Sequence, residues 1–198
     1  IALDSAGNVY TTNYGSNSVT KITPSGVSSK LGNTGSRPLG IVLDKQRNVF
    51  TANEGSNSVT KITPSGVSSK FGKTGSWPQG IAIDAARNIY TANWNSRNVT
   101  KITPTRSSTT LGRTGRRPIG IVVDPYGTVF TTNNGSNSVS QISRGGSSQI
   151  IARTGKRPIG IASDAAGFLY TANFGSNSVT EVFPKPRTSS GTIKLNTV

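Results

Sequence analysis

A 40-residue repeat runs through the chain and constrains its fold more than any other feature of the sequence. A short apolar motif ending in Asp, first present at Ile1–Asp4, returns every 40 residues. Self-similarity at a fixed period of this length is typical of solenoids and propellers. Five units account for nearly all of the 198 residues, so we predict a single domain, residues 1–198, with repeats 1–40, 41–80, 81–120, 121–160 and 161–198.

Each unit contains four segments of strand length. In the second unit they cover residues 40–44, 48–53, 58–64 and 67–73. These segments are rich in Val, Ile, Thr and aromatic residues, are bounded by Gly, Asn, Ser and Pro, and show no helical spacing of apolar residues. The first segment is almost continuously apolar, as expected of a strand buried on both faces, whereas the third and fourth are more polar.

Four antiparallel strands in about 40 residues, becoming more polar outward, describe one blade of a β-propeller. We therefore predict an all-β chain that forms a propeller of five four-stranded blades. Five units fit either a small closed ring or part of a larger one. The last unit departs from the repeat after Val182, and residues 191–198 are candidates for its outer strand.

Three segments of the second unit carry a resemblance to a known family. They are Pro38–Asp44 (PLGIVLD), Asn48–Asn53 (NVFTAN) and Asn57–Gly66 (NSVTKITPSG). They are similar to the repeat of NHL-type β-propellers and of their streptogramin B lyase-like relatives, and the similarity covers all five units. The resemblance implies a propeller fold, and for some NHL-type members it implies binding of single-stranded RNA.

Missing residue types exclude most kinds of catalytic site. The chain contains no Cys, His or Met, so it has no disulfide, no thiolate nucleophile, no Cys or His metal site and no imidazole base. The lyase-like relatives imply His and Glu with a divalent metal, and gluconolactonase-like propellers imply a metal held by Glu, Asn and Asp. Besides the repeated Asp, this chain has only Glu54 and Glu181 as acids. We therefore predict no catalytic residue, no metal, no cofactor and no enzymatic activity.

Two sets of repeated polar residues are interpreted as structural. An Asp ends each first strand, where its carboxylate can accept hydrogen bonds from the amides of a tight turn. The alternative is a ring of carboxylates that binds a cation. An Asn closes each second strand and is expected to hold the following loop. The Asp residues are Asp4, Asp44, Asp84, Asp124 and Asp164, and the Asn residues are Asn13, Asn53, Asn93, Asn133 and Asn173.

Basic and aromatic residues concentrate in two kinds of loop. The chain carries 22 Lys and Arg against 7 acids, and the four segments that connect one blade to the next hold ten of these basic residues and no acid. In the loop after each second strand, one position varies between blades and reads Tyr14, Glu54, Trp94, Asn134 and Phe174. Because strand direction alternates, both kinds of loop are expected on one face. The residue before the repeated Pro, which the proline is expected to hold extended, reads Arg37, Trp77, Arg117 and Arg157.

A basic face with interspersed aromatic rings can hold anionic polymers by charge and stack flat groups. We therefore predict that this face binds an anionic polysaccharide, a glycan or a nucleic acid. The alternatives are a protein-interaction subunit or homo-oligomer that uses an open edge, and a lyase-like propeller that has lost its catalytic residues. The predicted ligand-binding residues are Arg37, Trp77, Arg116, Arg117, Lys156 and Arg157, with Tyr14, Trp94 and Phe174.

The location of the protein is predicted from composition. The bias toward Thr, Ser, Asn and Gly favours an extracellular or cell-surface protein. No run of 18 or more apolar residues is present, so no membrane-spanning segment is expected.

Overall fold

The computed structural model describes residues 1–183, which form five antiparallel sheets. Each sheet is one blade, and its strands are hydrogen-bonded in chain order. The first blade consists of β1 (Ala2–Leu3), β2 (Val9–Asn13), β3 (Ser18–Ile22) and β4 (Ser28–Asn33). The second consists of β5 (Pro38–Leu43), β6 (Val49–Asn53), β7 (Ser58–Ile62) and β8 (Ser68–Lys73), with the short 3-10 turn η1 (Glu54–Ser56) between β6 and β7.

The remaining three blades follow the same order. The third contains β9 (Pro78–Ile83), β10 (Ile89–Asn93), β11 (Asn98–Ile102) and β12 (Ser108–Arg113). The fourth contains β13 (Pro118–Val123), β14 (Val129–Asn133), β15 (Ser138–Ile142) and β16 (Ser148–Arg153). The fifth contains β17 (Pro158–Ser163), β18 (Leu169–Asn173) and β19 (Ser178–Val182). The prediction of an all-β propeller is confirmed, while the proposed final strand at residues 191–198 lies outside the described residues.

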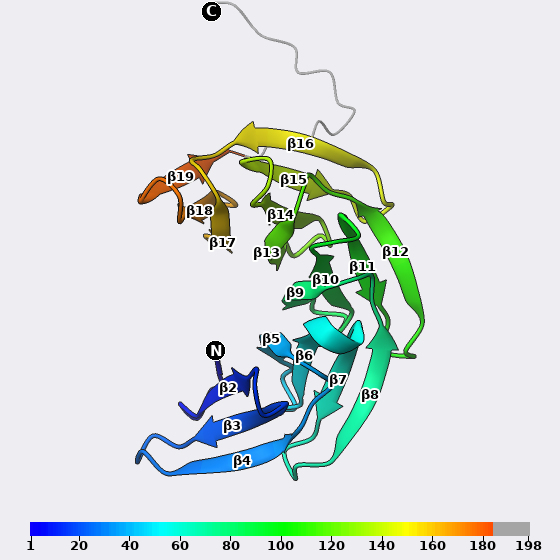
Figure 1. Ribbon diagram of the computed structural model, residues 1–198, viewed down its shortest axis with the longest axis vertical. Coiled ribbons are helices and arrows are strands. Elements are labelled where there is room, and N and C mark those ends of the chain that lie inside the picture. The colour runs from blue at the N-terminus through cyan, green and yellow to red at the C-terminus, as the bar shows by residue number, and fades with distance from the viewer. Residues whose placement is uncertain (184–198) are drawn as a thin grey trace, which may run out of the picture.

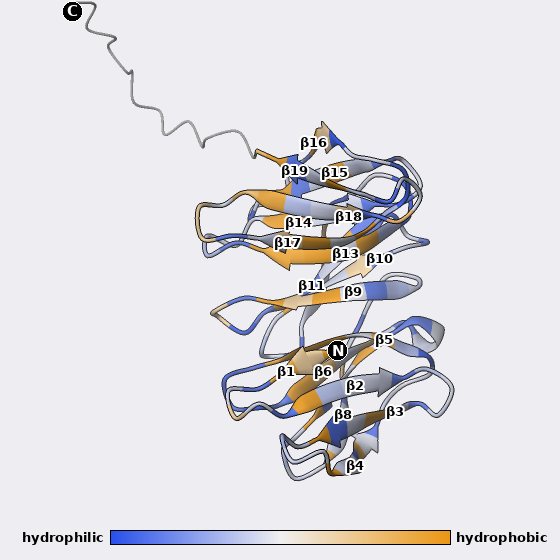
Figure 2. Cartoon of the chain, turned by 90° about the vertical axis from the view of Figure 1, so that its left-hand side faces the viewer, coloured by the Kyte–Doolittle hydropathy of each residue, from blue (hydrophilic) through white to orange (hydrophobic). Residues whose placement is uncertain are grey.

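The blades lie side by side around an open arc, with the first strands of neighbouring blades along its inner side and β4, β8, β12 and β16 along its outer rim (Figure 1). The first and fifth blades stand at the two ends of the arc (Figure 1). Seen toward the open side, apolar residues follow the strands, and hydrophilic residues follow the loops at both edges (Figure 2). No helix in residues 1–183 is long and apolar enough to span a membrane.

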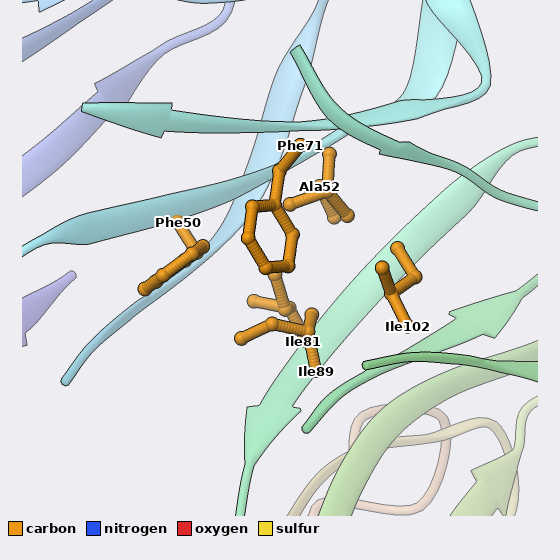
Figure 3. Close-up of a cluster of buried hydrophobic side chains, with 7 residues drawn as sticks. Phe50, Ala52, Phe71, Ile81, Ile89 and Ile102 are labelled. Atoms are coloured by element: carbon orange, nitrogen blue, oxygen red, sulfur yellow. The ribbon is translucent and has the colours of Figure 1, made fainter. Parts of the chain in front are cut away.

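Apolar side chains from facing sheets fill the space between neighbouring blades. The repeat places Val or Ile at equivalent positions of every blade, so each junction is built from the same kinds of side chain. Figure 3 shows most of the cluster between the second and third blades. Its buried members are Phe50, Ala52, Val59, Phe71, Ile81, Ile89 and Ile102. Because these residues come from two blades, each sheet depends on the next to cover its face.

The repeated Asp residues hold the turns between first and second strands. Asp4 accepts hydrogen bonds from the amides of Ala6 (3.0 Å) and Asn8 (2.9 Å) and from the Tyr10 hydroxyl (2.9 Å). Burial raises the pKa of Asp4, but hydrogen bonds from Asn8 Nδ2 (2.8 Å to Oδ2 and 3.1 Å to Oδ1), together with those from the two amides and the hydroxyl, outweigh it and lower the pKa to about 2. In the other blades the carboxylate likewise accepts from the amide four residues later, at Asp44, Asp84, Asp124 and Asp164. The structural interpretation of these residues is therefore confirmed.

Nothing among residues 1–183 covers one sheet face at the end of the arc. Val19, Val59, Val99 and Val139 are fully buried between blades, whereas Val179, at the same repeat position of the fifth blade, is 68% exposed. Phe174 and Ile159 are also exposed there, and the face borders a shallow cavity of about 520 Å³. This end of the arc therefore presents the kind of surface that the next blade covers at the other four positions.

This difference predicts unequal costs for one substitution at equivalent positions. We expect Val139→Ala to lower the free energy of unfolding by about 2 kcal/mol, because it removes buried methyl groups and leaves a cavity. Val179→Ala should change it by no more than about 0.5 kcal/mol, because that side chain is exposed. Urea denaturation of both variants measures the difference. Equal costs would mean that the face of the fifth blade is covered in solution.

Candidate functional site

A buried polar network fixes the loops on one face of the arc. Asn53 at the end of β6 is fully buried, and its Nδ2 donates to Ser58 Oγ (3.3 Å) and Thr60 Oγ1 (2.9 Å). Thr60 Oγ1 also accepts the amide of Gly35 (3.0 Å), in the connection from the preceding blade. A Cβ on Gly35 would lie only 2.8 Å from Asn53 Nδ2, so this close approach requires glycine. The repeated Asn residues thus hold the loops as the sequence predicted.

The two kinds of loop meet in hydrogen-bonded pairs. The amide of Arg37 donates to Asn17 Oδ1 of the preceding blade (2.8 Å), and its carbonyl accepts from the amide of Glu54 (2.9 Å). In the next connection the Trp77 carbonyl accepts from the amide of Trp94 (2.9 Å). The connections at residues 34–37 and 74–77 and the varying loop positions therefore lie together on one face, as their strand directions predicted. The expectation that all ten basic residues of the connecting segments share this face is wrong, because half of them lie in the outer strands β4, β8, β12 and β16. These are Lys30, Lys70, Lys73, Arg113 and Arg153.

The residue before each repeated proline adopts a left-handed backbone conformation. The φ angles of Arg37, Trp77, Arg117 and Arg157 are 54°, 58°, 55° and 53°. The prediction that proline holds these residues extended is therefore wrong. The hydrogen bonds on both sides of the residue select the left-handed conformation over the extended one. Glycine adopts this conformation freely, whereas for a bulky residue it costs about 1–3 kcal/mol.

Three arginines of this face lie over aromatic rings. The Arg117 guanidinium carbon is 4.9 Å from the centre of the Trp94 ring, and that of Arg157 is 5.1 Å from the Phe174 ring. Arg37 lies 5.9 Å from the Tyr14 ring. Such cation–π contacts hold a guanidinium plane in place while leaving its N–H groups free to donate.

A tryptophan pair extends one of these contacts into a stack. The Trp77 and Trp94 rings are 5.2 Å apart with an interplanar angle of 22°. Trp94 therefore contacts both Trp77 and Arg117, which come from two successive blade connections. Trp77 is 46% exposed and Trp94 is half-buried, so the stack presents a flat aromatic surface to solvent.

The other two predicted basic residues lie beside these stacks. Arg116 and Lys156 are exposed, and their backbone amides donate to Ser136 Oγ (3.1 Å) and Ser176 Oγ (3.0 Å). Within residues 1–183, neither side chain has a hydrogen-bond or ion-pair partner. The loops thus orient both backbones while the charges remain available.

Glu54 and Gln79 also belong to this face, although the sequence did not identify them as site residues. Glu54 accepts hydrogen bonds from the Tyr14 hydroxyl (3.1 Å) and from Gln79 Nε2 (3.4 Å). A signal for Gln79 was present, because the residue between the repeated Pro and Gly is Leu or Ile in three connections and Gln only here. These two side chains add acceptor oxygens to a face that is otherwise cationic and aromatic.

The acidic side chains do not assemble into a metal site in the described part of the chain. No three His, Cys, Asp or Glu residues among residues 1–183 lie close enough to hold an ion. The repeated Asp carboxylates are used by their turns. The available side chains therefore do not fit the His and Glu set that the resemblance implies.

Comparisons with known proteins identify relatives of the chain. The sequence model of the Virginiamycin B lyase family matches residues 1–194. No curated protein sequence matches the chain. Among solved structures, catalytically inactive virginiamycin B lyase from Staphylococcus aureus with quinupristin, a histidine-to-alanine variant, is 18% identical, with a TM-score of 0.77 over 93% of this chain and 69% of that chain.

Two further structures share the fold. A streptogramin B lyase is 17% identical, with a TM-score of 0.75 over 94% of this chain and 68% of that chain. A chain of a nidogen/laminin complex is 19% identical, with a TM-score of 0.77 over 91% of this chain and 73% of that chain.

The family match contradicts the prediction that the chain is not an enzyme, because the family is named for a lyase.

The left-handed residues before proline predict that one substitution increases stability. We expect Arg37→Gly to raise the free energy of unfolding by up to about 1 kcal/mol, because glycine relieves the backbone strain and only a long cation–π contact is lost. Arg116→Gly removes the same charge at a residue without positive φ and should lower stability. Urea denaturation compares the two. Equal loss of stability in both variants would contradict the assignment of strain to Arg37.

Proposed function

The chain belongs to the virginiamycin B lyase family, and we propose that its basic, aromatic face binds an anionic polymer or glycan. The observation that carries this proposal is the set of three arginines, each held over an aromatic ring on the same face. Guanidinium groups recognise phosphate, sulfate and carboxylate through paired N–H donors. The neighbouring rings offer flat surfaces for sugars or bases.

The backbone strain supports the same proposal. Four consecutive blade connections place a bulky residue where glycine would be less strained, and in three of them this residue is Arg. Strained backbone conformations cluster at active sites and ligand-binding sites. Glycine at these four positions would relieve the strain, but it would also remove the side chains that we propose contact the ligand.

Charge over the whole chain favours an anionic ligand. The formal net charge of +15 attracts polyanions over long distances and makes their association sensitive to salt. In a family of lyases the ligand of this face is also the candidate substrate. Any turnover of it by these 198 residues has to use groups other than imidazole, because they include no histidine.

Binding of a glycan and nucleic-acid array at two salt concentrations tests the proposal. We expect the parent to bind an anionic polymer, and the double variant Arg117→Glu/Arg157→Glu to lose at least about tenfold in affinity, since two donors become repulsive carboxylates. Lys45→Glu/Arg47→Glu, in an exposed turn at the opposite ends of the strands, makes the same charge change and is the control. Equal losses in both double variants would indicate attraction by net charge alone and contradict a site on this face.

The type of contact is distinguished by a third variant. Binding that resists salt and is lost in Trp94→Ala would identify a sugar-stacking site. Binding that weakens with salt and is lost mainly in the arginine variant would identify a polyanion site. Absence of binding to every member of the array would contradict the proposal.

A second candidate function, interaction with protein through the open end of the arc, is supported by the exposed face of the fifth blade. Val179 at 68% exposure is the clearest indication, because its four equivalents are fully buried. The structural neighbour in a nidogen/laminin complex supports protein binding by such propellers.

Mass in solution tests this second candidate. We expect a defined multimer for the parent and a smaller species for Val179→Lys, because a charge on the uncovered face opposes its burial. Val27→Lys, at an exposed residue of the first blade, is the control and should leave the mass unchanged. A monomeric parent would contradict self-association through this face.

A further inference from the structure

The outer rim carries a second cationic site that is separate from the loop face. A cavity of about 390 Å³ lies between the outer strands β8 and β12, and is lined by Lys70, Phe71, Gly72, Lys73, Arg106 and Ser108. These strands are neighbours on the rim in Figure 1. We infer that this cavity binds a phosphate or sulfate ester whose organic group is apolar.

The charges in the cavity are available to a ligand. Lys70, Lys73 and Arg106 are exposed, and no acid lines the cavity with them. In the part of the chain that the structure describes, none of the three side chains has a hydrogen-bond or ion-pair partner. Three cations and the Ser108 hydroxyl together can surround the oxygens of a tetrahedral anion, which accepts several hydrogen bonds at once.

The floor of the cavity is apolar. Phe71 is 6% exposed and packs edge-to-face on Phe50, with ring centres 5.0 Å apart, within the core cluster of Figure 3. The equivalent residues of the other blades are Leu31, Leu111 and Ile151, so an aromatic ring occurs at this position only in the second blade. A ligand held by the cations would therefore place its organic group near an aromatic edge.

Arg106 occupies a turn position that is glycine in three other blades. Its φ is 68°, and the equivalent residues Gly26, Gly66 and Gly146 have φ of 83°, 86° and 94°. A bulky residue in this conformation costs about 1–3 kcal/mol, and nothing in the turn itself requires Arg. The turn closes through the Arg106 amide and the Thr103 carbonyl (2.8 Å), as the glycine turns close at the same place.

At the equivalent turn position of two other junctions, glycine lies very close to the neighbouring blade. A Cβ on Gly66 would lie 2.6 Å from the carbonyl oxygen of Leu31, and one on Gly146 the same distance from that of Leu111. Such contacts do not occur for real Cβ atoms, so those two junctions close only because glycine is present. Residue 106 carries a Cβ at the position where those two turns have none, beside the cavity that its side chain lines.

The repeat provides internal comparisons for the chemistry of the cavity. At the junction of the first and second blades, Lys30 is present but Asn33 and Gly66 replace the other two cations. At the junction of the third and fourth blades, Arg113 is present but Thr110 and Gly146 replace the others. Of these three junctions, only the one between the second and third blades has a cationic residue at all three positions. The strands and turns that carry the positions are the same at each junction.

Calorimetric titration of the full chain with phenyl phosphate, and separately with phenyl sulfate, tests the inference. We expect Arg106→Gly to weaken binding by at least about tenfold, because it removes one cation. This variant restores the residue of three other blades and should fold. Arg87→Gly, at another left-handed arginine (φ 64°), makes the same change in charge and strain and is the control.

The comparison of ligands and variants separates this site from the loop face. Phenyl phosphate should bind more tightly than inorganic phosphate, because the apolar floor contacts the organic group, and equal affinities would contradict a site for an apolar ester. The tighter of the two phenyl esters identifies the preferred anion. Arg117→Glu/Arg157→Glu should retain binding of the phenyl esters. Loss of binding at the loop face and loss of binding at the rim cavity can then be told apart. No binding of either ester, or equal weakening in Arg106→Gly and Arg87→Gly, would overturn the inference.

Discussion

Burial of apolar side chains between facing blades is the interaction on which the rest of the structure depends. Each sheet is too small to bury its own faces, and its Val and Ile residues leave water only when the next sheet covers them. The sheets therefore pack against one another in sequence order around an arc. The same requirement explains why Val179 is exposed, since the fifth blade has no following sheet within residues 1–183.

The polar network at the loop face turns this packing into a surface of defined shape. The buried Asn and its hydroxyl partners bind the connection from the preceding blade, so that every connection reaches the same place relative to its neighbours. Because the backbone is fixed from both sides, the residue before proline is held in a conformation that it would not adopt alone. Its side chain then projects beside the varying loop position and contacts the ring there.

Both proposed sites arise where individual blades depart from an otherwise constant repeat. Tyr14, Trp94 and Phe174 vary at a position whose neighbours are nearly constant, and Arg106 replaces a glycine that three other blades retain. The packing that maintains the fold does not explain these substitutions. Their side chains are exposed or half-buried, and those on the loop face and on the rim are positively charged or aromatic.

The sequence alone determined the blade, because its 40-residue period, its four strands and its turn residues are local patterns that each unit repeats. It also predicted the shared loop face, since alternating strand direction decides where loops emerge. The left-handed conformation at Arg37 was not predictable from the neighbouring proline, because hydrogen bonds from two different blades select it. The open arc and the cavity at Arg106 were likewise decided only by tertiary structure. They depend on how closely whole sheets approach, which involves residues about 40 positions apart in the chain.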